Sequence, residues 1–230
     1  MKKERVFAIF GMGTFGSEVA EVLATQGGKI IAVDNRAKTI EKMKEKVTQA
    51  MIIDSTDEES LKNLPLEDID VAVIAIGEQI EASILTTALL KKLGIPYIIA
   101  RAITDIHAQV LKQVGASEVI NIELDEGRRL AQRLIAPDII ERIPISKNQT
   151  LAEIVIPKEF VGKTLLTLDL RKKLNINVIS VKRTITDIDD LGNPVKEEQI
   201  ITPQPDHVLE DKDILVIIGS DADINTFKDL

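Results

Sequence analysis

Residues 6–16 read Val6-Phe7-Ala8-Ile9-Phe10-Gly11-Met12-Gly13-Thr14-Phe15-Gly16, an apolar run that ends in the pattern G-x-G-x-x-G. Between a strand and a helix, the first glycine of this pattern makes the tight turn and the second lets the backbone approach a pyrophosphate. The third lets the helix pack closely on the strand. The phosphates of a ligand then lie at the N-terminus of the helix. The stretch predicts a nucleotide-binding turn, with a ligand-free glycine-rich turn as the alternative.

The segment after this turn agrees with a nucleotide site. A helical pattern is followed by a second apolar run over residues 29–33, which ends in Asp34, about 20 residues beyond the turn. An acid at this place can accept hydrogen bonds from both ribose hydroxyls. The same carboxylate repels a 2′-phosphate, so we expect NADP to bind poorly, although the nearby Arg36 partly offsets that repulsion.

Strand-like and helix-like segments continue to alternate as far as residue 122. The predicted strands cover 50–53, 71–76, 97–100 and 119–122, and the predicted helices cover 37–46, a segment after Thr56 that Thr56 caps, 80–93 and 104–114. Such alternation predicts parallel strands joined by right-handed crossovers. We therefore expect an α/β fold with a Rossmann-like, doubly wound parallel sheet whose ligand lies at the carboxyl ends of the strands.

The pattern changes after residue 124. We expect an amphipathic helix over 125–135 and, after Pro137, a second helical piece through Ile140. Its apolar face would be buried either on a second subunit or on its own sheet. From residue 146 the alternation becomes that of an antiparallel α+β domain. Its expected parts are strands over 151–156, 178–181, 198–201 and 213–219, a helix over 165–174, a turn over 189–194, and a last helix capped by Asp221 or Asp223. The predicted domains are 1–124, a crossover helix and linker over 125–144, and a small C-terminal domain over 145–230.

Composition excludes several classes of protein. The chain of 230 residues has 29 Lys and Arg against 37 Asp and Glu, and this net charge of -8 argues against a generic nucleic-acid binder. It has no cysteine, which rules out disulfides and thiolate metal sites. The longest apolar run, 71–76, is too short to cross a bilayer, and residues 1–5 lead directly into the first strand and leave no room for a signal peptide. We expect a cytoplasmic protein without a transmembrane segment.

Side chains suited to catalysis are scarce. His107 falls within a predicted helix and His207 in a polar loop, and neither is accompanied by a recognisable catalytic partner. Charged residues instead lie at strand ends, where this fold presents its ligand: Asp34, Asp54, Arg101 and Glu123. The guanidinium of Arg101 suits a phosphate, with a surface salt bridge as the alternative. A regulatory nucleotide site and an NAD-dependent oxidoreductase with a reduced substrate domain both remain open at this point.

The whole chain resembles the regulator-of-potassium-conductance (RCK) family, also called the TrkA N- and C-terminal domain family. The motifs that carry the resemblance are Phe10 to Gly16, Ala32-Val33-Asp34, Asp54-Ser55-Thr56, Val73 to Gly77, Ile84 to Leu90, Gly115-Ala116 and Ile122 to Gly127. The resemblance implies a cytosolic, non-enzymatic subunit that gates a bacterial Ktr- or Trk-type potassium-uptake system. It also implies a site for ATP, ADP or NAD(H), a crossover helix, homodimers assembled into an octameric ring, and a membrane-embedded potassium-translocating partner.

The same resemblance implies roles for individual residues. Asp34 matches the acid that binds the ribose, Asp54 and Ser55 match the adenine-side turn, and Arg101 matches the basic phosphate contact. Glu123 matches an acid that helps to hold a divalent cation near the triphosphate at the subunit contact. The other residues expected at this site are Gly11, Gly13, Thr14, Phe15, Gly16, Asn35, Ile76 and Gly77.

Two further features bear on the ligand. Ktr-type relatives often carry an arginine where this chain has Thr14, and that arginine touches the terminal phosphate. Its replacement by Thr14 puts discrimination between ATP and ADP in doubt. In the C-terminal part, Asp169, Arg171 and Asn177 resemble a pocket for cyclic di-AMP that forms between two C-terminal domains. The alternative is an ordinary exposed helix followed by a strand.

Overall fold

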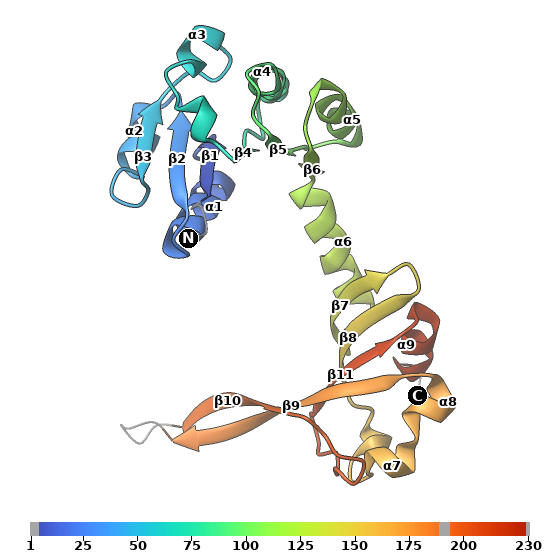
Figure 1. Ribbon diagram of the computed structural model, residues 1–230. Helices are drawn as coiled ribbons and strands as arrows, with labels where there is room; N and C mark the ends of the chain where they lie inside the picture. Colours follow the sequence, from blue (N-terminus) through green and yellow to red (C-terminus); the bar gives the residue numbers. More distant parts are fainter. Residues whose placement is uncertain (1–4, 189–193, 229–230) are drawn as a thin grey trace. The chain divides into compact units, whose positions relative to one another are not determined.

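The computed structural model describes residues 5–188 and 194–228 (Figure 1). The turn predicted over 189–194 lies outside these residues except for its last position, as do the first four residues of the chain. The chain forms two compact units, Met1–Gly127 and Arg128–Leu230. In the part of the chain that the structure describes, no helix has the length and apolar character needed to cross a membrane.

The first unit is built on a six-stranded sheet in the order β3-β2-β1-β4-β5-β6, with every pair parallel. The strands are β1 (Val6–Phe10), β2 (Lys29–Asp34), β3 (Gln49–Ile52), β4 (Val71–Ile74), β5 (Tyr97–Arg101) and β6 (Glu118–Ile120). The helices are α1 (Thr14–Thr25), α2 (Ala37–Glu41), α3 (Glu58–Leu61), the short 3-10 helix η1 (Leu66–Asp68), α4 (Ile80–Lys92) and α5 (Asp105–Val114). This order is that of the predicted doubly wound sheet, so the predicted fold class is confirmed for this unit.

Both faces of this sheet are covered, which explains why its central strands are continuously apolar. Ile9 of β1 packs in one core with Ala20 of α1 and Ile40 of α2. Its neighbour Phe10 points to the opposite face and shares a core with Leu90 of α4. Successive side chains of a strand alternate between the faces, so a strand buried on both sides needs apolar residues at every position.

Helix limits in this unit differ from the prediction at three places. Helix α2 ends at Glu41, five residues earlier than expected. The cap of α3 is Asp57 rather than Thr56, because an Asp57 oxygen accepts the Ser60 N–H at 2.9 Å. Strand β6 ends at Ile120 because Asn121 Oδ1 accepts the Leu124 N–H and starts the next helix, α6 (Ile122–Ile135), earlier than predicted.

The second unit contains an antiparallel five-stranded sheet in the order β10-β9-β11-β8-β7. The strands are β7 (Ile139–Ser146), β8 (Gln149–Val155), β9 (Asn177–Ile188), β10 (Pro194–Ile201) and β11 (Ile214–Gly219). The helices are η2 (Lys158–Phe160), α7 (Leu165–Leu168), α8 (Leu170–Leu174) and α9 (Asp221–Lys228). The ribbon of β9 and β10 extends away from the other strands of its sheet (Figure 1). A small α+β unit was expected here, and the structure confirms it.

Four expectations for this second unit were wrong in detail. The helical piece expected after Pro137 is strand β7, because Ile139 is buried and pairs with Ile154 of β8. The helix expected over 165–174 is broken at Asp169, whose φ of 47° is left-handed. Strands β9 and β10 are both longer than the expected 178–181 and 198–201.

The last helix also has a different cap from the one predicted. Ser220 caps α9, since its Oγ accepts the Asp223 N–H at 3.2 Å and donates to Asp223 Oδ2 at 2.6 Å. The boundary between the two compact units lies within α6. The predicted domain limits at 124 and 145 stay a prediction.

Candidate functional site

The polar residues predicted for the site gather along the carboxyl edge of the first sheet. Because all six strands are parallel, the residues that end β1, β2, β4 and β5 emerge at this same edge. The strand order turns back between β1 and β4, which makes this the topological switch point where open α/β sheets bind ligands.

The glycine-rich turn has the geometry that the sequence predicted. Gly11 adopts a φ of 95°, which favours glycine. A Cβ atom on Gly16 would lie 2.0 Å from the Gly11 carbonyl oxygen, so α1 and the turn approach one another more closely than any side chain permits. A Cβ on Gly13 would meet no atom within 4 Å. The backbone at Gly13 is therefore open to an approaching ligand at the start of α1.

Asp34 lies beneath this turn and is already hydrogen bonded. Its Oδ2 accepts the Met12 backbone N–H at 2.7 Å, and its Oδ1 accepts the Arg36 backbone N–H at 2.9 Å. The Arg36 side chain also donates from Nε at 3.0 Å and from Nη2 at 3.1 Å, one bond to each oxygen. The Asp34 side chain is only 5% exposed, whereas that of Arg36 is 63% exposed.

These contacts decide the charge state of Asp34. Burial alone raises the pKa of the carboxyl group, but the hydrogen bonds from the Arg36 side chain, the Met12 N–H and the Arg36 N–H outweigh it and hold the pKa below its ordinary value. Asp34 is therefore ionised near neutral pH, and its charge is paired with Arg36. A ribose hydroxyl that binds this carboxylate must share the carboxylate with the Arg36 side chain or displace that side chain.

The turn after β3 is held by its own side chains and by α4. Asp54 Oδ1 accepts the Thr56 N–H and the Thr56 hydroxyl, at 3.0 and 2.7 Å. Ser55 Oγ lies 2.8 Å from Oγ1 of the fully buried Thr86 of α4, which also bonds the Ser55 carbonyl oxygen. Thr86 lies in one of the family-like motifs, but its contact with Ser55 could not be expected from the sequence, because only the fold brings the two residues together. Asn35, the residue after Asp34, is exposed.

Arg101 and Glu123, which the sequence assigned to one ligand, pair with each other through Arg101 Nη2 and Glu123 Oε1. The guanidinium of Arg101 lies 5.9 Å from the centre of the Phe15 ring. It also covers Gly77, where a Cβ atom would lie 2.9 Å from a guanidinium nitrogen. Ile76, just before Gly77, is only partly exposed and packs against the core. The structure thus gathers Phe15, Gly77 and Glu123 around the guanidinium of Arg101.

The environment of Glu123 favours its ionised form. Glu123 lies in the first turn of α6, and a hydrogen bond from its own backbone N–H, followed by the one from Arg101, lowers the pKa of its carboxyl group. The described residues contain no group of three or more His, Cys, Asp or Glu that could hold a metal ion, so the divalent cation predicted at Glu123 stays a prediction.

In the second unit, the three residues predicted to bind cyclic di-AMP come from one short segment. Asp169 stands between α7 and α8, the exposed Arg171 lies on α8, and the exposed Asn177 begins β9.

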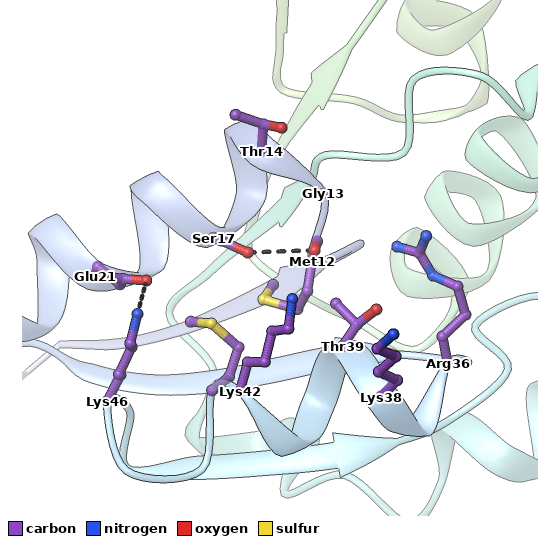
Figure 2. Close-up of a pocket in the computed structure, with 11 residues that line it drawn as sticks. Met12, Gly13, Thr14, Ser17, Glu21, Arg36, Lys38, Thr39, Lys42 and Lys46 are labelled. Atoms are coloured by element: carbon purple, nitrogen blue, oxygen red, sulfur yellow. Dashed lines mark hydrogen bonds and ion pairs between the residues drawn. The ribbon is translucent and has the colours of Figure 1, made fainter.

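A pocket of about 350 Å³ lies between α1 and α2 (Figure 2). Its lining residues are Met12, Gly13, Thr14, Ser17, Glu21, Arg36, Lys38, Thr39, Lys42, Met43 and Lys46. Among these residues, only the glycine turn and Arg36 were expected from the sequence to lie near a ligand. A signal was present, because Lys38, Lys42 and Lys46 recur at every fourth position.

Known protein families match both parts of the chain. The TrkA-N domain family matches residues 7–122, and the TrkA-C domain family matches residues 151–230. Ktr system potassium uptake protein C of Bacillus subtilis is 37% identical over 228 residues, which cover 99% of this chain and 97% of that protein. Ktr system potassium uptake protein A of Vibrio alginolyticus is 31% identical, with 94% and 93% covered.

Solved structures share the fold. The GsuK channel superposes with a TM-score of 0.65 at 20% identity over 97% of this chain, and the GsuK channel bound to NAD superposes with a TM-score of 0.61 at 19% identity over 99%. This chain spans 39% of the length of those two solved chains.

Proposed function

Because the chain belongs to the family whose members combine a TrkA-N with a TrkA-C domain, we propose that it is the nucleotide-sensing regulatory subunit of a bacterial potassium-uptake system. The observation that carries the proposal is the open turn at Gly13 above the buried carboxylate of Asp34, at the switch point of the sheet. The names of the two Ktr relatives support the link to potassium uptake.

In this proposal the ligand is ATP, ADP or NAD(H). Its 5′-phosphates lie on the backbone at Gly13 and Thr14 and at the N-terminus of α1, where the dipole of the helix favours negative charge. Its ribose lies at Asp34 and its adenine at the turn of Asp54 and Ser55. Structures of the fold bound to NAD and to ADP support this class of ligand.

The phosphate end of the ligand reaches Arg101. A phosphate there competes with Glu123 for the guanidinium, and Glu123 stands in the first turn of α6. A triphosphate with a divalent cation gives Glu123 a replacement partner, since carboxylate and phosphate oxygens are the ligands that such ions prefer. This exchange links the nucleotide to the start of the crossover helix.

The output of the site is the gating of a membrane-embedded potassium-translocating subunit. We place the protein in the cytoplasm, at the inner face of the membrane through that partner, as homodimers assembled into an octameric ring. A second regulatory ligand, cyclic di-AMP, is proposed at Asp169, Arg171 and Asn177 between two C-terminal domains. A nucleotide gates only if it binds two arrangements of the assembly with different affinity.

The proposed role requires no chemical reaction. The polar groups at the carboxyl edge of the sheet are engaged with one another as Asp34–Arg36 and Arg101–Glu123. The histidine of this unit, His107, is only 2% exposed and lies within α5. An NAD-dependent oxidoreductase needs a proton-transfer group beside the nicotinamide. Steady turnover of NADH with a carbonyl substrate would overturn the regulatory assignment.

The deciding experiment is isothermal titration of the full chain with ATP, ADP, NAD and NADH, followed by potassium flux in vesicles that contain the cognate membrane subunit. We expect saturable binding of at least one of these nucleotides and a flux that changes with the nucleotide bound. Absence of binding by all four would refute the proposed nucleotide site. Binding without any change of flux would refute the gating role.

A further inference from the structure

The pocket between α1 and α2 begins at the proposed ribose site. Met12 donates its backbone N–H to Asp34 and also lines the pocket. Arg36 does the same, because its guanidinium bonds both oxygens of Asp34 while it forms part of the pocket wall. A ribose held at Asp34 therefore has its hydroxyl groups at the entrance of this pocket.

The pocket carries an excess of positive charge. Four of its lining side chains are cations, and two of these are neutralised: Arg36 by Asp34, and Lys46 by Glu21 at 2.7 Å. Lys38 and Lys42 form no ion pair with the residues that the structure describes. In Figure 2 the side chains of Arg36 and Lys42, which flank α2 at its two ends, extend toward Met12. A phosphate monoester carries about 1.5–2 negative charges near neutral pH, which matches the two cations left over.

Hydroxyl groups complete the lining. Ser17 contributes one from α1, and Thr39 contributes one from α2, whereas the side chain of Thr14 points away from the pocket (Figure 2). Ser17 Oγ donates to the Met12 carbonyl oxygen at 3.2 Å, which holds the beginning of α1 against the turn. Lysine ammonium groups and hydroxyls are the donors that phosphate oxygens accept from.

We propose that this pocket receives an additional phosphate carried on the 2′ or 3′ oxygen of the ribose. The inference rests on the proposed function, since Asp34 must first place the ribose. It reverses the expectation from sequence that Asp34 repels such a phosphate. The structure supplies the reason: Arg36 neutralises Asp34, and Lys38 and Lys42 lie beyond it in the same pocket. The ligand class is a nucleotide with a second phosphate on its ribose, beside the 5′-phosphates at Gly13.

Matched ligand pairs test the proposal on the full chain. NAD against NADP isolates a 2′-phosphate, and AMP against 3′-phosphoadenosine 5′-phosphate isolates a 3′-phosphate. We expect the additional phosphate of at least one pair to increase affinity about tenfold at low salt, and the gain to shrink as ionic strength rises. Substitution of Lys38→Gln together with Lys42→Gln removes the gain and leaves NAD and AMP affinities within about twofold.

The control variant is Lys44→Gln, which lies outside the pocket and pairs with Glu41. It keeps the gain from the additional phosphate. If NAD or AMP binds, but NADP and 3′-phosphoadenosine 5′-phosphate bind no more tightly than these two ligands, the inference is wrong and the proposed function stands. If none of ATP, ADP, NAD, NADH and AMP binds, the proposed function fails and the inference fails with it. If inorganic phosphate binds in the pocket and neither NADP nor 3′-phosphoadenosine 5′-phosphate displaces it, the pocket is a free-anion site and the inference is also wrong.

Discussion

Replacing Asp34 by asparagine keeps the size of the side chain but removes its charge and half of its acceptor oxygens. The carboxylate accepts four hydrogen bonds, from the Met12 N–H and from three groups of Arg36. An amide offers one oxygen and turns its NH₂ group toward donors, so one buried N–H loses its partner. Such a donor costs about 1–3 kcal/mol, and the lost ion pair with the exposed Arg36 adds less than about 1 kcal/mol. We expect Asp34→Asn to lower the free energy of unfolding by about 2 kcal/mol at pH 7.

The effect of Asp34→Asn on ligand binding is separate and similar in size. Each hydrogen bond from a ribose hydroxyl to a carboxylate contributes about 1.5–3 kcal/mol, against about 1 kcal/mol for a neutral acceptor. Weakening two such bonds lowers the affinity for ADP and NAD by roughly 30-fold, measured by isothermal titration below the melting temperature of the variant.

Arg36→Gln is the matched control. It removes the ion pair but keeps the carboxylate and its hydrogen bond from the Met12 N–H. It should therefore change the free energy of unfolding by less than about 1 kcal/mol and leave the affinity for ADP unchanged. If Asp34→Asn melts as expected but binds ADP as the wild type does, the ribose does not lie at Asp34 and the reasoning is wrong.

The pH dependence gives a second measure of the same contact. The folded pKa of Asp34 lies below its ordinary value of 3.8, because hydrogen bonds from Arg36 and Met12 outweigh the opposing effect of burial. The carboxylate therefore stabilises the fold fully above the unfolded pKa, and this contribution is lost as pH falls through the folded pKa. The stability difference between the wild type and Asp34→Asn should be constant near neutrality and shrink below about pH 4.

Three further predictions concern other parts of the first unit. Gly16→Ala places a Cβ 2.0 Å from the Gly11 carbonyl oxygen and should lower the free energy of unfolding by about 3 kcal/mol, measured by denaturant titration. In Gly13→Ala the new Cβ has open space, so this variant should melt as the wild type does but lose nucleotide binding. Glu123→Gln should leave folding and ADP binding nearly intact and abolish any divalent-cation dependence of ATP binding. A lower melting temperature without ligand, with an unchanged ATP response, would show instead that Glu123 only supports the start of its helix. Burial lowers the pKa of His107 in the folded chain. The contribution of neutral His107 to the free energy of unfolding should therefore be complete above about pH 6.5 and fall by at most about 1.4 kcal/mol per pH unit below it. His107→Gln should flatten this slope.

The fold of the first unit could be predicted because its signals are local. The glycine pattern, the apolar strands and the positions of the turn residues each depend on neighbours in sequence, and the Rossmann strand order follows once the crossovers are right-handed. The start of α6 was misplaced because a capping Asn121 was read as part of a strand. Strand β7 was missed because Ile139 is buried by its pairing with Ile154, which a local pattern does not reveal.

The site was predictable only as a set of residue positions. The sequence placed Asp34, Arg101 and Glu123 at the carboxyl edge, where the structure has them. It did not reveal that Arg36 clamps Asp34, since two residues of separation permit such contact without requiring it. Nor did it reveal the contact of Thr86, which reaches Ser55 from 31 positions away in the chain.

If nucleotides bind as proposed, the two ion pairs at the carboxyl edge let one site respond differently to different nucleotides. A ligand that reaches only the ribose position meets Asp34 and Arg36 and leaves the pair of Arg101 and Glu123 intact. A ligand with phosphates long enough to reach Arg101 exchanges an internal partner for an external one, and it frees a carboxylate in the first turn of α6. A hydrogen bond from the Glu123 backbone N–H, besides the one from Arg101, lowers the pKa of this carboxyl group, so Glu123 stays charged in the first turn of α6 when Arg101 leaves it. In the proposed mechanism the second kind of ligand changes the balance of charge at α6, so we expect it to bind two arrangements of the protein with different affinity, which is the condition for gating.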